Sequence, residues 1–209
     1  MKSIVLFLAV HFTFISCHSQ NNETKSKKHV GGPCQGCEAV LEYGNKKLTS
    51  TDTLPDFETT VPKLKLTGTV YKKDGKTPAE DVVLYIYHTN RDGIYPKSGN
   101  EKGWGKRHGY LQGWVKTNSS GKYTFYTFRP ASYPNGNTPE HIHITVKEPN
   151  INEYYLDDFM FADDSLLTES FQEKLTERGG SGIVQPKKGN GILTVKRDII
   201  LGLNIPNYP

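Results

Sequence analysis

Short runs of alternating hydrophobic and polar residues recur along the chain, and turn-forming residues separate them. In KLKLTGTVY, for example, Leu64, Leu66 and Val70 share one face of an extended segment, and Asp74-Gly75 then marks a turn. Similar runs occupy residues 82–88, 112–117, 122–128, 141–146, 154–161 and 191–203. Strands separated by turns at such short intervals predict an all-β chain folded as an antiparallel β-sandwich.

Three segments depart from this simple picture. A short strand is expected at residues 40–44, apart from the main series, and a long Gly- and Lys-rich loop at residues 96–109. One short helix is predicted after the run at 141–146, because Asp164-Ser165 is typical of a helix start and Gly179-Gly180 of a stop. The residues spaced for its apolar face are Leu166, Leu167, Phe171 and Leu175.

The first residues are typical of an export signal. Lys2 precedes an apolar run of roughly twelve residues, too short to span a bilayer, which needs about 20. Residues 1–16 are therefore predicted to be a signal peptide. The following Phe14-Ile15-Ser16-Cys17 resembles the lipobox of bacterial lipoproteins, in which the cysteine becomes a lipid anchor. Because Phe14 stands where leucine is usual, cleavage by the ordinary signal peptidase is the alternative.

An exported protein of the cell envelope is the expected product, attached through Cys17 at the periplasmic or outer-membrane face. Residues 17–33 are polar and predicted to be a flexible tether, which leaves residues 34–209 as one domain. The net charge of +4 comes from lysines scattered among acidic residues, without a basic stripe. Nothing in this pattern favours nucleic-acid binding.

The remaining cysteines, Cys34 and Cys37, lie together in GGPCQGCEAV. In an exported protein a short-range disulfide is the default interpretation of such a pair. A structural metal site would need two further ligands, and only His29 is close in sequence. A thioredoxin-like redox role would need a βαβ context, which the strand pattern does not supply.

The run at 141–146 carries the strongest candidate chemistry. Successive side chains of a strand point to opposite faces, so His141 and His143 share one face, and Ile142, Ile144 and Val146 share the other. The aliphatic residues are expected in the core. Two adjacent imidazoles suit one metal ion, since imidazole is a common ligand for iron, zinc and copper. The alternative is a pair of surface histidines on an edge strand.

Several segments resemble, in order, the intradiol ring-cleavage dioxygenases, the family of the catechol and protocatechuate enzymes. The opening hairpin LTGTVYKKDGKTPAEDVVLYIYHTNRDGIY ends in the family's Gly-x-Tyr turn, and LQGWVKTNSSGKYTFYTFRPASYP contains its Gly-x-Tyr-x-Phe and Pro-x-x-Tyr-Pro. PEHIHITV matches the family's Pro-x-His-Ile-His strand, and YYLDDFMFADD and VKRDIILG align with the strands that follow. The resemblance implies an intradiol-type β-sandwich.

The resemblance also implies a single ferric ion held by two tyrosinates and two histidines. Carried over by position, these ligands are Tyr95, Tyr133, His141 and His143. Fe³⁺ is a hard ion that suits phenolate oxygen, and binding would deprotonate a tyrosine well below its free pKa near 10. Two phenolates and one hydroxide would balance the 3+ charge.

Other aromatic residues offer alternatives to this assignment. If Tyr95 or Tyr133 is not a ligand, Tyr110 and Tyr126 are the next candidates. The remaining aromatic residues of interest are expected mainly to pack, although the tryptophans could line a pocket: Tyr87, Tyr123, Trp104 and Trp114.

The activity implied by the resemblance is cleavage of a catechol-type ring between its two hydroxyls, with both atoms of O₂ entering the product. The partners are then a small aromatic diol and O₂, and no organic cofactor is needed. Tyr133 would act as the base that takes a proton from the substrate. The protein's part is geometry and charge neutralisation.

Two positions depart from the family pattern. Thr138 stands three residues before His141, where the family has an arginine, and Asp157-Asp158 stands where a Thr-Gln pair is usual. An acidic residue beside the site would disfavour a bound catechol dianion unless it were protonated or turned away. Arg91 or Arg129 could supply the missing positive charge.

Two other classes of function remain open at this point. The opening hairpin is also typical of transthyretin-like and carboxypeptidase-regulatory-like sandwiches, which are non-catalytic binding modules and do not require the Tyr133–His141–His143 combination. A third interpretation keeps the site but fills it with zinc or copper, which histidine pairs also bind.

Overall fold

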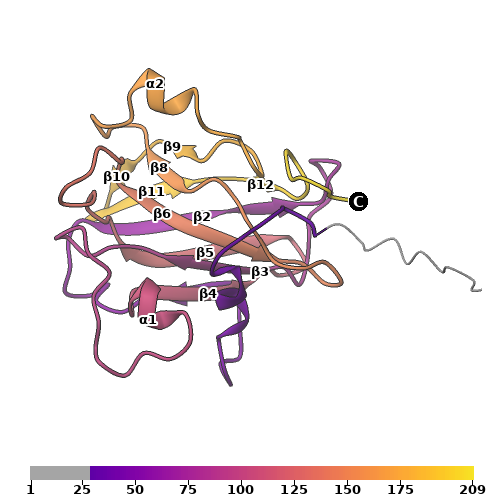
Figure 1. Cartoon of the computed structure of the whole chain (residues 1–209), viewed down its shortest axis with the longest axis horizontal. Coiled ribbons are helices and arrows are strands. Elements are labelled where there is room, and N and C mark those ends of the chain that lie inside the picture. The colour runs from indigo at the N-terminus through magenta and orange to yellow at the C-terminus, as the bar shows by residue number, and fades with distance from the viewer. Residues whose placement is uncertain (1–28) are drawn as a thin grey trace, which may run out of the picture.

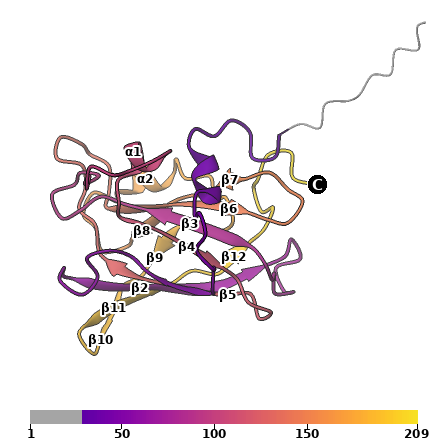
Figure 2. The ribbon, with the colours of Figure 1, turned by 90° about the horizontal axis from the view of Figure 1, so that it is seen from below.

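The computed structural model describes residues 29–209; the predicted signal peptide, the Cys17 anchor and most of the predicted tether lie outside this range. The described residues form two six-stranded sheets packed against each other (Figures 1 and 2). The predicted β-sandwich is confirmed. Among the described residues, no helix has the length and apolar character needed to cross a membrane.

In the first sheet the strand order is β1-β5-β2-β11-β10, and β12 pairs with the far end of β2. Its strands are β1 (Thr51–Thr53), β2 (Lys63–Tyr71), β5 (Lys122–Phe128), β10 (Lys187–Gly189), β11 (Ile192–Lys196) and β12 (Ile199–Ile200). The predicted runs at 64–70 and 122–128 therefore lie side by side, paired antiparallel from Lys63 opposite Phe128 to Thr69 opposite Lys122.

The second sheet has the order β4-β3-β6-β8-β9, with β7 also paired to β6. Its strands are β3 (Val83–Tyr87), β4 (Gln112–Lys116), β6 (His141–Lys147), β7 (Tyr154–Tyr155), β8 (Phe159–Phe161) and β9 (Ile183–Val184). The histidine strand β6 is thus central, between β3 and β8. The predicted strand at 154–161 is divided into β7 and β8 because residues 156–158 leave the ladder.

Both sheets are mixed, because parallel pairs that the alternation did not indicate stand beside the expected antiparallel ones. Parallel pairs are β1 with β5, β11 and β12 with β2, and β9 with β8. Each of these pairs joins strands that are distant in sequence. Alternation within one strand identifies its faces but carries no information on the direction of a partner reached by a long connection.

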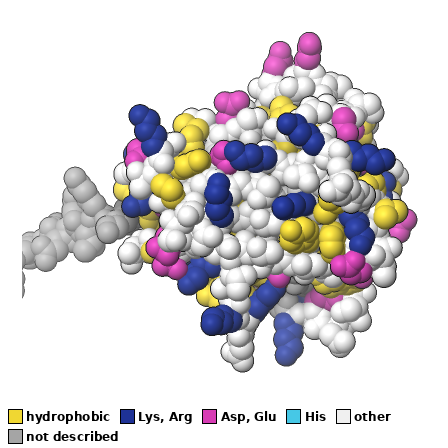
Figure 3. All heavy atoms as spheres, turned by 180° about the vertical axis from the view of Figure 1, so that it is seen from behind, with side chains coloured by type: hydrophobic (Ala, Val, Ile, Leu, Met, Phe, Trp, Pro, Cys, Tyr) yellow, Lys and Arg dark blue, Asp and Glu magenta, His cyan; other side chains and the backbone are white. Residues whose placement is uncertain are grey.

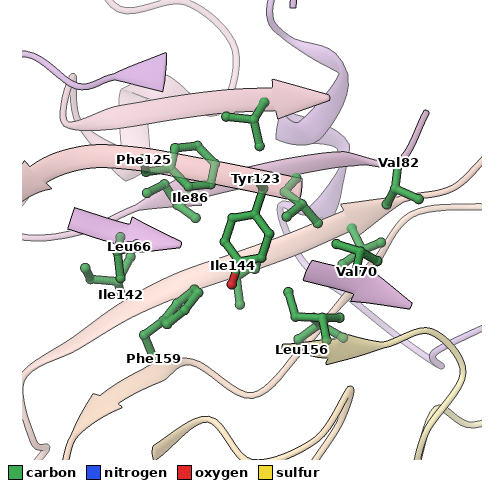
Figure 4. Packing of buried hydrophobic residues seen from close by; sticks show 14 of the residues in the cluster. Leu66, Val70, Val82, Ile86, Tyr123, Phe125, Ile142, Ile144, Leu156 and Phe159 are labelled. Atoms are coloured by element: carbon green, nitrogen blue, oxygen red, sulfur yellow. The ribbon is translucent and has the colours of Figure 1, made fainter. Parts of the chain in front are cut away.

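Alternate residues of the two sheets fill the space between them (Figure 4). Leu66 and Phe125 enter from the first sheet, and Ile142 and Ile144 enter from β6 of the second. Ile142, Ile144 and Val146 are all essentially inaccessible to solvent. The predicted division of β6 into an aliphatic core face and a histidine face is therefore present.

The helix predicted from residue 164 is much shorter than expected. Only α2 (Glu169–Gln172) is helical, and the side chain of Thr168 caps it by accepting from the Phe171 amide. Asp164 instead closes a turn, with its side chain accepting from the Leu166 amide, and Thr168 has extended backbone angles. Local side-chain capping at these two residues competes with a continuous helix.

Two other short helices occupy segments predicted as strand or loop. The 3₁₀ helix η1 (Cys37–Leu41) replaces the strand expected at 40–44, and α1 (Gly105–His108) interrupts the predicted loop at 96–109. The sulfur atoms of Cys34 and Cys37 form a disulfide that reaches the first residue of η1. Val40 of η1 is buried against the outer face of the second sheet, in a small cluster with Val83 and Tyr85.

The described end of the predicted tether, residues 29–33, packs on the sandwich. The Gly31 amide donates to the carbonyl of Pro206, and Arg178 donates to the Gly31 carbonyl. On the face shown in Figure 3, basic and acidic side chains are interspersed and no large patch of one sign is visible.

Candidate metal centre

Four of the residues singled out from the sequence meet at one point on the outer face of the second sheet. The Oη atoms of Tyr95 and Tyr133 are 2.6 Å apart, and Tyr95 Oη lies 2.8 Å from His143 Nε2. Tyr133 Oη lies 3.1 Å from His141 Nε2 and 3.5 Å from His143 Nε2. Two phenol oxygens and two imidazole nitrogens therefore converge.

The two tyrosines come from different loops that pack together. Tyr95 follows β3, and Tyr133 lies in the connection from β5 to β6. Gly93 holds the loops close, because a Cβ on this residue would lie 2.0 Å from the Ser132 carbonyl oxygen. Its φ of +75° is also a conformation that favours glycine. The Gly-x-Tyr motif thus has a structural reason at Gly93.

Both histidines turn the same ring nitrogen toward the tyrosines. His141 Nδ1 lies 2.7 Å from the carbonyl oxygen of Pro139, and His143 Nδ1 lies 3.1 Å from Asp158 Oδ1. An acceptor at Nδ1 fixes the proton there and leaves the Nε2 lone pair free. The two lone pairs therefore point to the place where the phenol oxygens meet.

Without a cation, this site favours the neutral forms of its tyrosines and of His141. Burial raises the pKa of Tyr95, and the hydrogen bond to Tyr133 raises it further. Burial also raises the pKa of Tyr133 and lowers that of His141, the latter with a contribution from the charge of His143. A metal ion supplies the positive charge that phenolate oxygens require. The donor set therefore fits a hard cation such as Fe³⁺.

A carboxylate stands beside this group. His141, His143 and Asp158 bring possible ligand atoms within 4.8 Å of one another. Asp158, however, contacts Nδ1 of His143, on the side of the ring away from the phenol oxygens. Burial would raise the pKa of Asp158, but the charge and hydrogen bond of His143 hold it below the ordinary value.

Tyr87 belongs to the site and not to the core, which corrects the prediction from sequence. Its half-buried ring stacks on His143, with centroids 4.5 Å apart, and on His108, with centroids 3.8 Å apart. Tyr87 is paired with His143 in the β3–β6 register, so both side chains emerge from the same face. Tyr123, by contrast, is buried in the core as predicted.

A cavity of about 360 Å³ lies against three of the four converging residues. Tyr95, Tyr133 and His143 form its floor, and its walls are Gln35, Tyr87, Trp104, Arg107 and His108. A second cavity of about 270 Å³ adjoins it through Gln35, Tyr87 and His143, and reaches Asp158 and Tyr155. The disulfide loop that carries Gln35 therefore borders both cavities.

Several residues considered from sequence lie elsewhere. Arg129 pairs with Glu140 and Asp163, and Arg91 donates to the carbonyls of Arg129 and Pro130. Neither arginine lines the cavity above the tyrosines. The Tyr110 hydroxyl donates to Asp56, and Tyr126 packs against Phe57, so neither alternative tyrosine reaches the site.

Other residues of the site were not found from sequence. Arg107 and His108 lie on α1, within a segment predicted to be loop, and Gln35 lies in the disulfide loop. No periodic pattern marks these three positions. Trp104 lines the cavity, whereas Trp114 packs on Tyr85 and donates to the Ala39 carbonyl.

The chain is similar in sequence to a characterised oxygenase. No family model matches it. Among curated proteins it is similar to catechol 1,2-dioxygenase 1 of Acinetobacter lwoffii, with 28% identity over 195 residues. The match covers 84% of this chain and 58% of that protein, so the chain spans little more than half the length of this relative.

Solved structures of dioxygenases share the fold. The dioxygenase domain of a Streptomyces dioxygenase–carbohydrate-binding fusion has a TM-score of 0.56 at 19% identity, over 77% of this chain and 94% of that one. Catechol 1,2-dioxygenase from Acinetobacter has a TM-score of 0.56 at 20% identity, over 73% and 56%. Hydroxyquinol 1,2-dioxygenase from Pseudomonas putida has a TM-score of 0.55 at 16% identity, over 75% and 62%.

At these identities the structural likeness shows a common fold, and the sequence match adds a relative with a named activity. The chain therefore has the intradiol dioxygenase fold, and its resemblance to the intradiol ring-cleavage dioxygenase family is confirmed.

Proposed function

We propose that this protein is an Fe(III)-dependent dioxygenase that opens the ring of a small aromatic diol between its two hydroxyls, using O₂. The observation that carries the proposal is the convergence of Tyr95, Tyr133, His141 and His143, with phenol oxygens and imidazole Nε2 atoms 2.6–3.5 Å apart. These four side chains would hold the ion. Distant relatives named as catechol and hydroxyquinol 1,2-dioxygenases support the reaction class.

The ferric ion, when bound, would supply coordination of both substrate hydroxyls and a path for electrons between the diol and O₂. The chain itself would first supply negative charge to balance the ion. Two phenolates would offset most of the 3+ charge in a half-buried site, where an uncompensated charge is costly. The rings of Tyr95 and His143 are in turn held by Tyr87, which stacks on His143 and packs against Tyr95 at a tilt.

The cavity walls would orient the substrate. Tyr87, Trp104 and His108 line a space of about 360 Å³, and aromatic walls of this kind suit a flat ring. Tyr133 would take the proton of one substrate hydroxyl at its Oη, and Tyr95 would remain in place. The choice of Tyr133 follows the family pattern, since both tyrosines lie in loops, Tyr95 beside Tyr87 and Tyr133 beside His141.

A non-catalytic binding module needs no such convergence. A sandwich that only mediates contacts gains nothing from burying two phenols against two imidazoles, each with its Nδ1 occupied. Zinc and copper also bind histidine pairs, but the two phenol oxygens favour a harder ion.

Turnover is the direct test of the proposed function. Full-length protein loaded with ferric iron should consume O₂ when a catechol or hydroxyquinol is added, and yield a ring-opened dicarboxylic acid with both atoms of labelled O₂. The Tyr133→Phe variant should lose this activity, whereas Tyr110→Phe, at a tyrosine that binds Asp56, should keep it. Ferric-loaded protein that consumes no O₂ with any diol of a broad panel would contradict the proposal.

Export and lipid attachment at Cys17 form part of the same proposal. The support is the apolar run after Lys2, the lipobox-like residues before Cys17, and a disulfide at Cys34–Cys37, which suits an oxidising compartment. Labelled fatty acid should enter the wild-type protein and not Cys17→Ser. Equal labelling of the two proteins would contradict lipid attachment at this residue.

A further inference from the structure

Asp158 is the charged residue that contacts a histidine of the site. Both carboxylate oxygens lie 3.1 Å from Nδ1 of His143, and the two side chains are about equally buried, at 23% and 25% exposed. Within residues 29–209, no other side chain or backbone group hydrogen-bonds to this carboxylate. Arg197 is nearby, but it donates to the main-chain carbonyl of Asp157.

The position of Asp158 is fixed by its backbone. It lies between β7 and β8, and Gly182 packs so closely on it that a Cβ there would be 2.2 Å from the Asp158 carbonyl oxygen. The amide of Met160 donates to the Gly182 carbonyl and closes this contact. The carboxylate therefore meets His143 from a segment whose backbone is held against Gly182.

The two histidines differ in what holds them. His141 Nδ1 has a neutral backbone carbonyl as its acceptor, whereas His143 Nδ1 has a carboxylate. Both acceptors fix the Nδ1–H tautomer. Only the carboxylate adds a negative charge, which makes the Nε2 lone pair of His143 a stronger metal ligand. A fixed negative charge also attracts a trivalent ion more strongly than a divalent one.

We infer that Asp158 is a positioning residue that acts through His143: it orients the imidazole with Nε2 toward Tyr95 and Tyr133, and its charge favours a trivalent over a divalent metal ion. The choice of a trivalent ion rests on the proposed function; the orientation of His143 does not.

The neighbouring Asp157 provides a matched control. Its carboxylate accepts from the Thr176 hydroxyl and the Glu177 amide, and it does not contact either histidine. Asp157→Asn therefore removes one negative charge from the same segment without touching the site. A general effect of net charge or of local stability would appear in this variant as well.

The orientation is tested in metal-free, full-length protein at pH 8 by the ¹⁵N chemical shifts of the histidine rings. His143 should be an Nδ1–H tautomer in wild type and in Asp157→Asn, and Asp158→Ala should move it toward Nε2–H. His143 found as Nε2–H in wild type, or unchanged in Asp158→Ala, would overturn the positioning role.

The charge is tested with Asp158→Asn, which keeps an oxygen beside His143. Competition with chelators should show a 10–100-fold loss of Ga³⁺ affinity, the usual range for outer-shell changes, and a smaller loss for Zn²⁺. Asp157→Asn should match wild type. An unchanged ratio of Ga³⁺ to Zn²⁺ affinity in Asp158→Asn would overturn the preference for a trivalent ion.

These readouts separate the inference from the proposed function. If His143 has the expected tautomer but the wild-type protein develops no tyrosinate colour with ferric iron, the proposed function fails and the orienting role of Asp158 stands. If the colour develops but the tautomer and the affinity ratio do not respond at Asp158, the inference fails and the proposed function stands.

Discussion

Lowering the pH from 7 to 5 should reduce the free energy of unfolding through one buried imidazole, that of His88. This residue follows β3 and is completely buried, with Nδ1 2.7 Å from the Thr89 carbonyl oxygen and Nε2 2.7 Å from Thr127 Oγ1. Its ring also meets Phe128 edge-on, with centroids 5.1 Å apart. Burial lowers its pKa from 6.5 to about 4, and the charges of His143 and His141 act in the same direction.

The magnitude follows from the two pKa values. A folded-state pKa below the unfolded one means that the unfolded chain binds the proton first as the pH falls. The stabilising contribution of His88 to the free energy of unfolding is therefore complete above pH 6.5, and it is lost as the pH falls toward 4. The expected loss between pH 7 and pH 5 is roughly 2 kcal/mol, with a limiting slope of about 1.4 kcal/mol per pH unit.

Urea denaturation at pH 7, 6 and 5 measures this loss by comparison with His88→Gln, whose amide does not titrate. The variant will be less stable than wild type at pH 7, but its unfolding free energy should fall by roughly 2 kcal/mol less on going to pH 5. Other buried groups that titrate, such as His108, are present in both proteins and cancel in the difference. Parallel pH profiles for the two proteins would contradict a lowered pKa of His88 in the folded state.

Three further predictions concern the sandwich, each measured by urea denaturation. Leu66→Ala removes a fully buried side chain from between the sheets and should cost about 2–5 kcal/mol; a loss below 1 kcal/mol would contradict the packing in Figure 4. Gly68→Ala would put a Cβ 1.8 Å from the Arg197 carbonyl oxygen and should cost about 1–3 kcal/mol or more; wild-type stability would rule out this close approach. Tyr123→Phe leaves that buried carbonyl without the 2.8 Å hydrogen bond from the tyrosine and should cost about 1–3 kcal/mol; an unchanged midpoint would count against this bond.

The strands and the histidine pair could be predicted from the sequence because each rests on local alternation. His141 and His143 share a face for the same reason that Ile142 and Ile144 share the core, and the two-residue period of a strand is independent of its partners. Parallel pairing, such as that of β11 with β2, depends on long connections and was not predictable in this way.

The rest of the site depends on tertiary packing. Tyr87 could not be assigned from its own strand, because alternation does not say which face is core; its pairing with His143 decides this. The role of Asp158 was open for a similar reason, since sequence did not say whether it faced the histidines or turned away, and Asp157 is the one that turns away. Arg107 and His108 reach the cavity only through α1, which is too short to leave a periodic pattern.

Tyr95 and Tyr133 are expected to bind a ferric ion together with His141 and His143, and the visible spectrum of the iron-loaded protein tests this binding. Full-length protein loaded with ferric iron should develop a red to burgundy charge-transfer band from tyrosinate. Replacement of Tyr133 by Phe should bleach or shift the band, while Tyr110→Phe should leave it unchanged. A protein that remains colourless with ferric iron would contradict binding of the ion by these tyrosines. So would a band that survives unchanged in both Tyr133→Phe and Tyr95→Phe.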